Sequence, residues 1–232
     1  MWNNTNPLPV DQGQRDRSKY AMNPGPRITR RRWLLRLLVV LIASSASYLV
    51  VQVLLDEPEI ALEIGGTYEG MRVQSTARFS PLIRGHIWFG IPKTDARLRF
   101  IDDQYGFITP SARFFTVSFN DNVITNLRMS PQIEPLLFDD AMKVVLDLQN
   151  QWRERGWIPI RRNSAPPFAD TPEWRAQLRD VINKGGTTYW QAGNKYQIMM
   201  YMHRFRDSKR PNEERYLITL ALAKPWLPTH VE

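Results

Sequence analysis

The feature that most constrains this chain is a long apolar run near its N-terminus. Residues 37–55 comprise 19 consecutive uncharged residues, broken only by three serines and one glutamine. A helix of this length rises about 1.5 Å per residue and covers about 30 Å, the thickness of the hydrocarbon core of a bilayer. The run predicts a single transmembrane helix over residues 33–55, anchored in the lipid bilayer by Trp33, Leu37, Val40, Ile42, Leu49, Val51 and Leu55.

The charges on the two sides of this run predict its orientation. Arg30, Arg31 and Arg32 precede it, and an acidic segment at 56–59 follows it. Because Lys and Arg collect on the cytoplasmic side of a membrane, we expect a single-pass protein of the bacterial inner membrane with a cytoplasmic N-terminus and a periplasmic C-terminal domain. A cleaved twin-arginine signal is the alternative, although the apolar segment of a signal is only roughly 7–15 residues long.

The distribution of charge separates the N-terminal part from the rest. The chain has a formal net charge of +8, but residues 1–55 contain eight Lys and Arg against two Asp, which leaves only +2 for residues 56–232. A nucleic-acid-binding domain carries its basic residues on the folded part, so nucleic acid is not an expected partner. The chain has no cysteine, which excludes disulfides and thiol chemistry.

These observations divide the chain into four parts. Residues 1–32 are expected to form a disordered basic cytoplasmic tail, 33–55 the transmembrane helix, 56–66 a connector and 67–232 the periplasmic domain. Small residues within the apolar run are compatible with helix–helix packing, so a homodimer stays open as an alternative.

The first half of the predicted domain has the period of β-strands. Phe115, Val117 and Phe119 alternate with polar residues, and a second alternating segment follows at 123–129. Asn and Asp at 120–122 favour a turn, so the two segments predict a hairpin. Weaker alternation at 72–79 and 97–100 predicts further strands.

The second half combines two helices with a further group of strands. Residues 136–156 have a helical period and end at Gly156, while Thr171 and Pro172 mark the start of a second helix that is expected to end at 185–186. Strands are expected at 187–191, 195–205 and 216–223. The predicted fold class is therefore α+β: the transmembrane helix, then one periplasmic domain with an antiparallel sheet and two helices packed on one face, in the order β-β-β-α-α-β-β-β.

No motif for catalysis, a cofactor or a metal is present. The three histidines, His86, His203 and His230, are far apart, and the sequence contains no HExxH, GxSxG, P-loop or GxGxxG pattern. Its acidic pairs are adjacent residues, which point to opposite faces of a strand and do not form a dyad by themselves. We therefore expect no catalytic residue, no cofactor and no metal, with an unrecognised hydrolase as an alternative.

The many aromatic residues indicate a protein-binding surface. Aromatic residues on both faces of one strand cannot all be buried beneath a single sheet, so some should be exposed. Exposed Trp and Tyr beside Arg are typical of protein interfaces. The residues that we expect to contact a protein partner are Trp88, Trp190, Tyr201, Arg204 and Arg206.

Several short segments resemble small single-pass inner-membrane envelope proteins of Gram-negative bacteria. These segments are IEPL at 133–136, DA at 140–141, LQ at 148–149, RGW at 155–157 and ERYLITLALA at 214–223. Some such proteins act as immunity proteins beside type VI secretion effectors. The resemblance implies a membrane-tethered periplasmic domain that binds a protein partner and occludes a toxic effector. The alternative is a bitopic structural or accessory component of an envelope complex for secretion or division.

Overall fold

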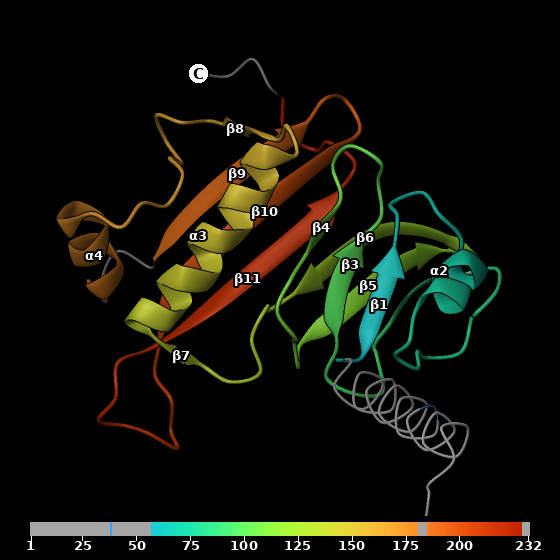
Figure 1. The fold of residues 1–232 in the computed structure, drawn as a ribbon, viewed down its shortest axis with the longest axis horizontal. Coiled ribbons are helices and arrows are strands. Elements are labelled where there is room, and N and C mark those ends of the chain that lie inside the picture. Colours follow the sequence, from blue (N-terminus) through green and yellow to red (C-terminus); the bar gives the residue numbers. More distant parts are fainter. Residues whose placement is uncertain (1–37, 39–56, 181–184, 229–232) are drawn as a thin grey trace, which may run out of the picture. The chain divides into compact units, whose positions relative to one another are not determined.

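The computed structural model describes residue 38, residues 57–180 and residues 185–228 (Figure 1). The chain divides into two units, Met1–Leu55 and Asp56–Glu232; the second is compact and is described below. All of the predicted lipid-contacting residues, from Trp33 to Leu55, and the three arginines Arg30, Arg31 and Arg32 lie outside the described residues.

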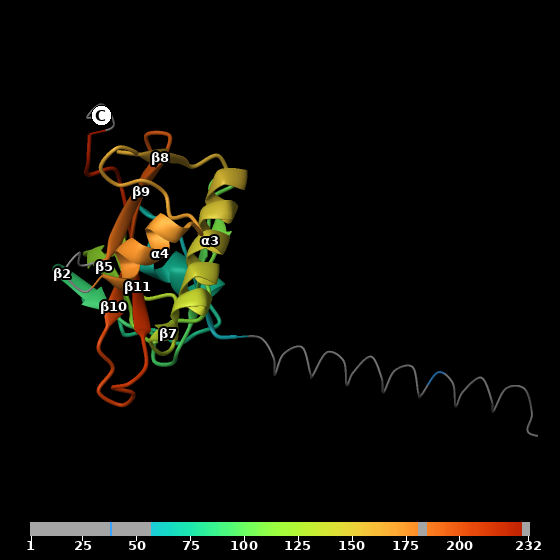
Figure 2. The same cartoon turned by 90° about the vertical axis from the view of Figure 1, so that its left-hand side faces the viewer.

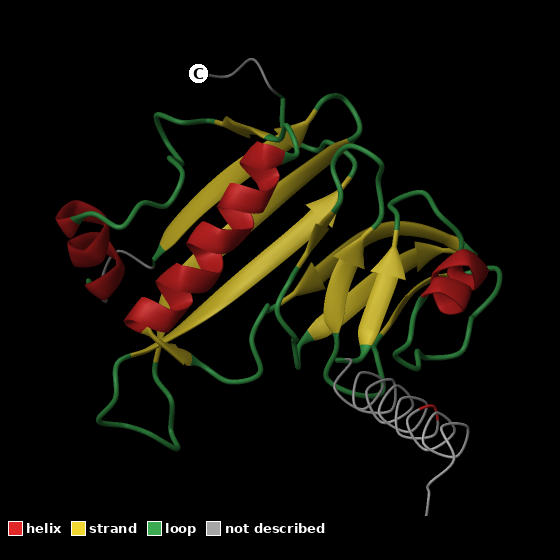
Figure 3. Cartoon of the chain, in the orientation of Figure 1, coloured by secondary structure: helices red, strands yellow, loops and turns green. Residues whose placement is uncertain are grey.

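The second unit is built around a large antiparallel sheet (Figure 3). Its strands follow the spatial order β2 (Ile87–Gly90), β5 (Phe115–Asn120), β6 (Val123–Met129), β11 (Arg215–Ala223), β10 (Tyr196–Phe205), β9 (Gly186–Ala192) and β8 (Ile158–Ile160). The short strand β7 (Leu136–Leu137) pairs with the start of β11. Because β2 lies at one end of this order, only one of its two edges is paired with a strand of the sheet.

A second, smaller sheet contains β1 (Glu59–Leu62), β3 (Arg97–Phe100) and β4 (Phe107–Ile108). β1 and β3 pair in parallel, and β3 and β4 pair antiparallel. Leu98 and Phe100 point into the same core as the buried residues of the large sheet, whereas Arg97 and Arg99 point away from it. The small sheet therefore adds to the core of the large one and does not form a separate domain.

Three helices complete the described part of the unit: α2 (Tyr68–Gln74), α3 (Phe138–Glu154) and α4 (Pro172–Arg179). Ala141, Val145, Leu148 and Trp152 recur on the buried face of α3, which lies against one side of the large sheet (Figure 2). The helix ends at Glu154, and Gly156 just beyond it has a positive φ of 84°, the left-handed conformation that glycine adopts after a helix end. The predicted α3 is therefore confirmed.

α3 and the small sheet lie next to each other. The Gln151 side chain on α3 accepts a hydrogen bond from the Ile108 N–H and donates one to the Ile108 carbonyl, both at 3.0 Å. The Phe107 ring lies 5.7 Å from the Trp152 ring. The Gln151 side chain therefore pairs with the edge of β4 as a neighbouring strand would. The core beneath α3 and β4 is continuous.

The predicted fold class is wrong. It joined a transmembrane helix to one antiparallel sheet with two helices on one face. Among the described residues no helix is long and apolar enough to cross a membrane, and the second unit contains three helices and two sheets, one with a parallel strand pair. The single-sheet description failed because β1 lies in the part expected to be a connector and pairs with a strand that starts 38 residues further along the chain.

Individual elements were predicted with mixed success. The hairpin β5–β6 is confirmed. The strands expected at 187–191 and 195–205 are also confirmed, and they pair as a second hairpin, β9–β10. Asp121 and Gly193 have positive φ in the two turns. The strand expected at 72–79 is wrong, because residues up to Gln74 form α2. α4 starts at Pro172 after the Thr171 N-cap as predicted, but it ends at Arg179 rather than at 185–186.

Candidate functional site

The two tryptophans predicted to contact a partner lie in the core. Trp88 is 8% exposed and stacks on Phe119 with ring centroids 4.4 Å apart. Trp190 is fully buried, with its ring 5.5 Å from that of Trp152. Both residues occupy the inward positions of their strands, where the alternation of side chains directs them to the core. We therefore assign Trp88 and Trp190 to stability and not to partner contact.

The other three predicted contact residues lie on or just after β10, and the structure does not gather them into one patch. Tyr201 is half-buried on the outer face of the large sheet, where its ring stacks 4.9 Å from that of His203. Arg204 occupies the opposite face, and its guanidinium donates to the Arg179 carbonyl at 3.4 Å. Arg206 is exposed just beyond the strand. Partner contact by these three residues stays a prediction.

His203 leads to a prediction about the pH dependence of stability. Burial lowers the pKa of His203, and its Nδ1 has no hydrogen-bond partner within the described residues. The unfolded chain binds a proton near the ordinary His pKa of about 6.5, while the folded chain binds it only at lower pH. Stability that is present above this pKa is therefore lost as the pH falls below it. Urea unfolding at pH 5 and pH 7 should show a smaller difference for His203→Gln than for wild type. The exposed His86→Gln is the control, and an unchanged difference in His203→Gln would contradict the assignment.

Four exposed apolar side chains lie on and beside the edge strand β2. Ile87 is 84% exposed, Phe89 69%, Ile91 52% and Ile83 50%. The first three occupy alternate positions, so their side chains share the outer face of the large sheet. We call these four residues the β2 patch. Single exposed apolar side chains are common on protein surfaces, whereas a cluster of them is typical of an interaction site.

β2 is held in place by the side chains that point the other way. Trp88 donates from Nε1 to the Asp121 carbonyl at 3.0 Å and packs with Tyr68, Phe79 and Phe119. Gly90 lies so close to Phe79 that an added Cβ would be 2.4 Å from a ring carbon. The strand is therefore anchored by its inner face, and the β2 patch is not needed to hold it.

The hydrogen bonds around β2 show which of its backbone groups face the open edge. The His86 carbonyl accepts from the Asp121 N–H at 2.9 Å, so 86 and 121 form a bonded pair next to β5. Bonded and non-bonded pairs alternate in an antiparallel ladder, so the N–H and C=O of Ile87 and Phe89 point away from β5. By the same alternation the N–H and C=O of Ile91 also point away from β5. The Ser80 hydroxyl bonds to both of these groups from that open side.

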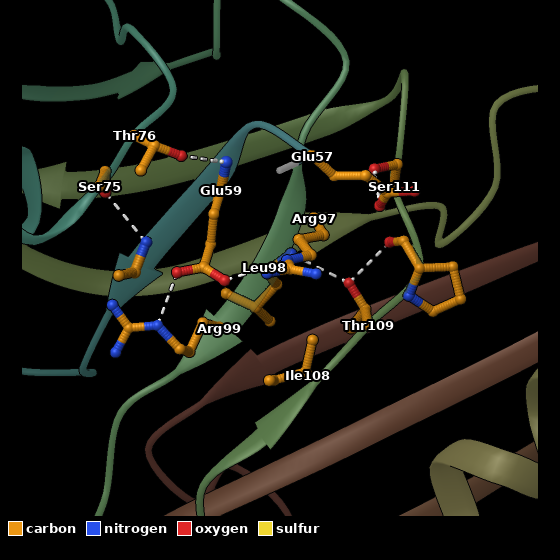
Figure 4. Close-up of polar contacts among 12 residues, drawn as sticks. Glu57, Glu59, Ser75, Thr76, Arg97, Leu98, Arg99, Ile108, Thr109 and Ser111 are labelled. Atoms are coloured by element: carbon orange, nitrogen blue, oxygen red, sulfur yellow. Dashed lines mark hydrogen bonds and ion pairs between the residues drawn. The ribbon is translucent and has the colours of Figure 1, made fainter. Parts of the chain in front are cut away.

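Two clusters of charged groups elsewhere in the domain are structural. The Glu59 carboxylate accepts from Arg97 Nε at 3.0 Å and from Arg99 Nε at 2.6 Å (Figure 4). The backbone N–H of the same residue donates to Thr76 Oγ1 and that of Ala61 to Ser75 Oγ. This arrangement joins β1 to β3 and to the segment after α2, and it leaves both carboxylate oxygens occupied.

The second cluster surrounds Asp102. Its carboxylate accepts from the N–H groups of Gln104 and Tyr105 and from the Tyr196 hydroxyl at 3.1 Å, with Lys195 at 3.4 Å. Burial raises the pKa of Asp102, but these donors outweigh it and the pKa lies below its ordinary value. Burial and then the Asp102 carboxylate raise the pKa of Tyr196. An ionised, fully bonded carboxylate beside a neutral phenol organises a turn and is unsuited to acid–base exchange near neutral pH.

The described part of the chain offers no candidate metal site. Residues 57–180 and 185–228 contain no group of three or more His, Asp or Glu side chains that could hold a metal ion. The β2 patch is therefore the candidate functional site.

Sequence reasoning missed the β2 patch. Trp88 was expected to contact the partner, whereas its neighbours Ile87 and Phe89 were not singled out. The signal that was present is the alternation of large apolar residues at 87, 89 and 91 with the small Gly90 between two of them.

The fold and the site define an α+β domain with an exposed apolar edge strand. No family model matches the chain, and no curated protein or solved structure matches it.

Proposed function

We propose that this domain is a protein-binding module and that the β2 patch is its contact surface. The observation that carries the proposal is the exposure of Ile87 and Phe89 side by side on an edge strand. Natural proteins usually cover such edges, or protect them with charged residues and proline, because an unpaired apolar edge invites association. The absence of such protection at these two positions is expected where association is the function.

The partner that we propose is a periplasmic protein, and the consequence of binding is the occlusion of a toxic effector. Support for this part comes from the sequence: the resemblance of five segments to envelope proteins and the basic-to-acidic change of charge between 30–32 and 56–59. Inhibition by occlusion needs a contact surface and no catalytic group. The alternative is an accessory component of a secretion or division complex.

The contact surface is tested by affinity purification of the full-length protein. A polypeptide that copurifies with the wild type is expected to be lost with the double variant Ile87→Ser, Phe89→Ser, because truncating buried apolar anchors removes most of the binding energy of an interface. The matched control is Val73→Ser on α2, a position that is 76% exposed and outside the patch. Retention of the same polypeptide by the double variant would overturn the proposal.

Two further measurements separate the proposed immunity role from the alternative. A neighbouring gene product that kills cells from the periplasm only when this protein is absent supports immunity. Loss of function on deleting residues 1–32, with the rest still exported, favours an accessory component. A C-terminal alkaline phosphatase fusion tests the localisation, since inactivity of the fusion would place the domain in the cytoplasm.

A further inference from the structure

The geometry points to strand addition as the mode by which this domain binds its partner. This inference rests on the proposed function and specifies the chemistry of the partner. We infer that an extended segment of the partner pairs with the open edge of β2. The segment has apolar residues at alternate positions and acidic residues on both sides of them. Main-chain bonds give affinity in this mode and alternate side chains give specificity.

The backbone of β2 provides a short, defined docking edge. The N–H and C=O of Ile87 and of Phe89 face the open side, as the phase set by His86 and Asp121 requires. The next groups in that phase, on Ile91, are already bonded to Ser80. An incoming strand can therefore pair over 87–89 and must leave the edge at Ile91.

The exposed side chains give the incoming strand a place for its own apolar residues. Directly opposed residues in neighbouring strands have Cβ atoms about 4.5–5.5 Å apart, and aromatic and β-branched pairs are favourable there. Ile87 and Phe89 lie on the same face, so residues at alternate positions of the partner pack against them. This accounts for the apolar alternation that we assign to the partner.

Basic residues flank the open edge on both sides. Arg84 precedes β2 and Lys93 follows it; both are exposed, and neither forms an ion pair with any described residue. Residues 70–94 contain no Asp or Glu. The Asp121 carboxylate accepts the Gly85 N–H at 2.8 Å and supports the turn before β2. Charge complementarity therefore selects acidic residues on the partner.

The same charges disfavour a second copy of this chain on the edge. Two antiparallel β2 strands that pair Ile87 with Phe89 place Arg84 of one copy opposite Pro92 of the other, beside Lys93. Like charges in this arrangement are destabilising. A homodimer through β2 is therefore not the expected occupant.

The chemistry is tested with synthetic peptides and the full-length protein. The probe is a short peptide with valines at alternate positions, threonines between them and paired glutamates at both ends. It is expected to bind roughly tenfold more tightly than the same peptide with lysines at its ends. The variant Arg84→Glu, Lys93→Glu should reverse this preference. Equal binding of the two peptides, or no binding of either, would overturn the assignment of an acidic partner, as would self-association of the protein that Phe89→Ser abolishes.

The binding mode is tested through the backbone. Two methylated versions of the peptide are compared, each with N-methyl groups on every second residue, so that each lacks the N–H donors of one edge. Affinity is expected to fall about tenfold for the peptide whose methylated edge faces β2 and to stay unchanged for the other. Amide exchange of Ile87 and Phe89 should slow on binding. The two proposals fail separately. If a copurified partner depends on Phe89 but leaves these two amides unprotected, strand addition is overturned while the protein-binding function stands.

Discussion

Replacing Trp152 by alanine is expected to lower the free energy of unfolding by about 3–5 kcal/mol, the cost of removing a large aromatic side chain from a core. Trp152 is fully buried in the last turns of α3. Its ring lies 5.5 Å from that of Trp190 on β9 and 5.7 Å from that of Phe107 on β4. One side chain thus joins the long helix to both sheets, and surrounding residues that belong to three elements cannot readily collapse into the cavity.

The effect of this substitution is measured by equilibrium unfolding in urea and by thermal unfolding. For a domain of this size each kcal/mol corresponds to about 2–4 °C, so the midpoint should fall by roughly 6–20 °C. The matched control is Trp226→Ala, because Trp226 is 44% exposed and should change the free energy by less than about 0.5 kcal/mol. A loss below about 1 kcal/mol for Trp152→Ala would show that the ring is not part of a rigid core.

Elements with a long, clear period were predictable from the sequence. α3 has 17 residues, and six apolar residues mark its buried face over that length. α2 has only seven residues and buries just Tyr68 and Met71, which is too few for the helical period to be distinguished from a strand. The length of the periodic segment made α3 recognisable, whereas the eight-residue α4 was recognised from Thr171 and Pro172 at its start.

The small sheet could not be predicted because its pairing is non-local. β1 has four buried residues, including Glu59, whose charge made the segment resemble a solvated connector. This carboxylate is buried only because Arg97 and Arg99, on a strand far along the chain, neutralise it. A sequence pattern does not record which distant arginines meet a glutamate.

The candidate site was missed because the alternation of side chains along a strand does not show which of its two faces is buried. In β2 the pattern separates Trp88 from Ile87 and Phe89, but both sets are apolar and either could face the core. In the structure Phe119 stacks on Trp88 in the core, and Phe79 leaves no room for a side chain at Gly90. The same ambiguity explains why Trp88 was assigned to the surface.

A second large effect is expected for Gln149→Leu, which should lower the free energy of unfolding by about 2–5 kcal/mol. Gln149 is fully buried on α3; its Oε1 accepts from the Phe168 N–H at 2.9 Å and its Nε2 donates to the Phe168 carbonyl at 2.8 Å. Leucine has nearly the same volume but leaves both backbone groups buried without a partner, at about 1–3 kcal/mol each. Phe168 in turn packs on Trp174 of α4, with the rings 4.8 Å apart.

The measurement for Gln149→Leu combines urea unfolding with amide exchange. If the glutamine holds the segment before α4, exchange of the Phe168 amide should accelerate more than that of Leu98, which lies in the small sheet. The matched control is Gln177→Leu on α4, an exposed glutamine without a hydrogen bond to the described residues, which should cost less than about 0.5 kcal/mol. Equal losses for the two variants would mean that the Phe168 backbone finds another partner. Such a result would remove the reason for a polar residue on the buried face of α3, where the helical period alone calls for an apolar one.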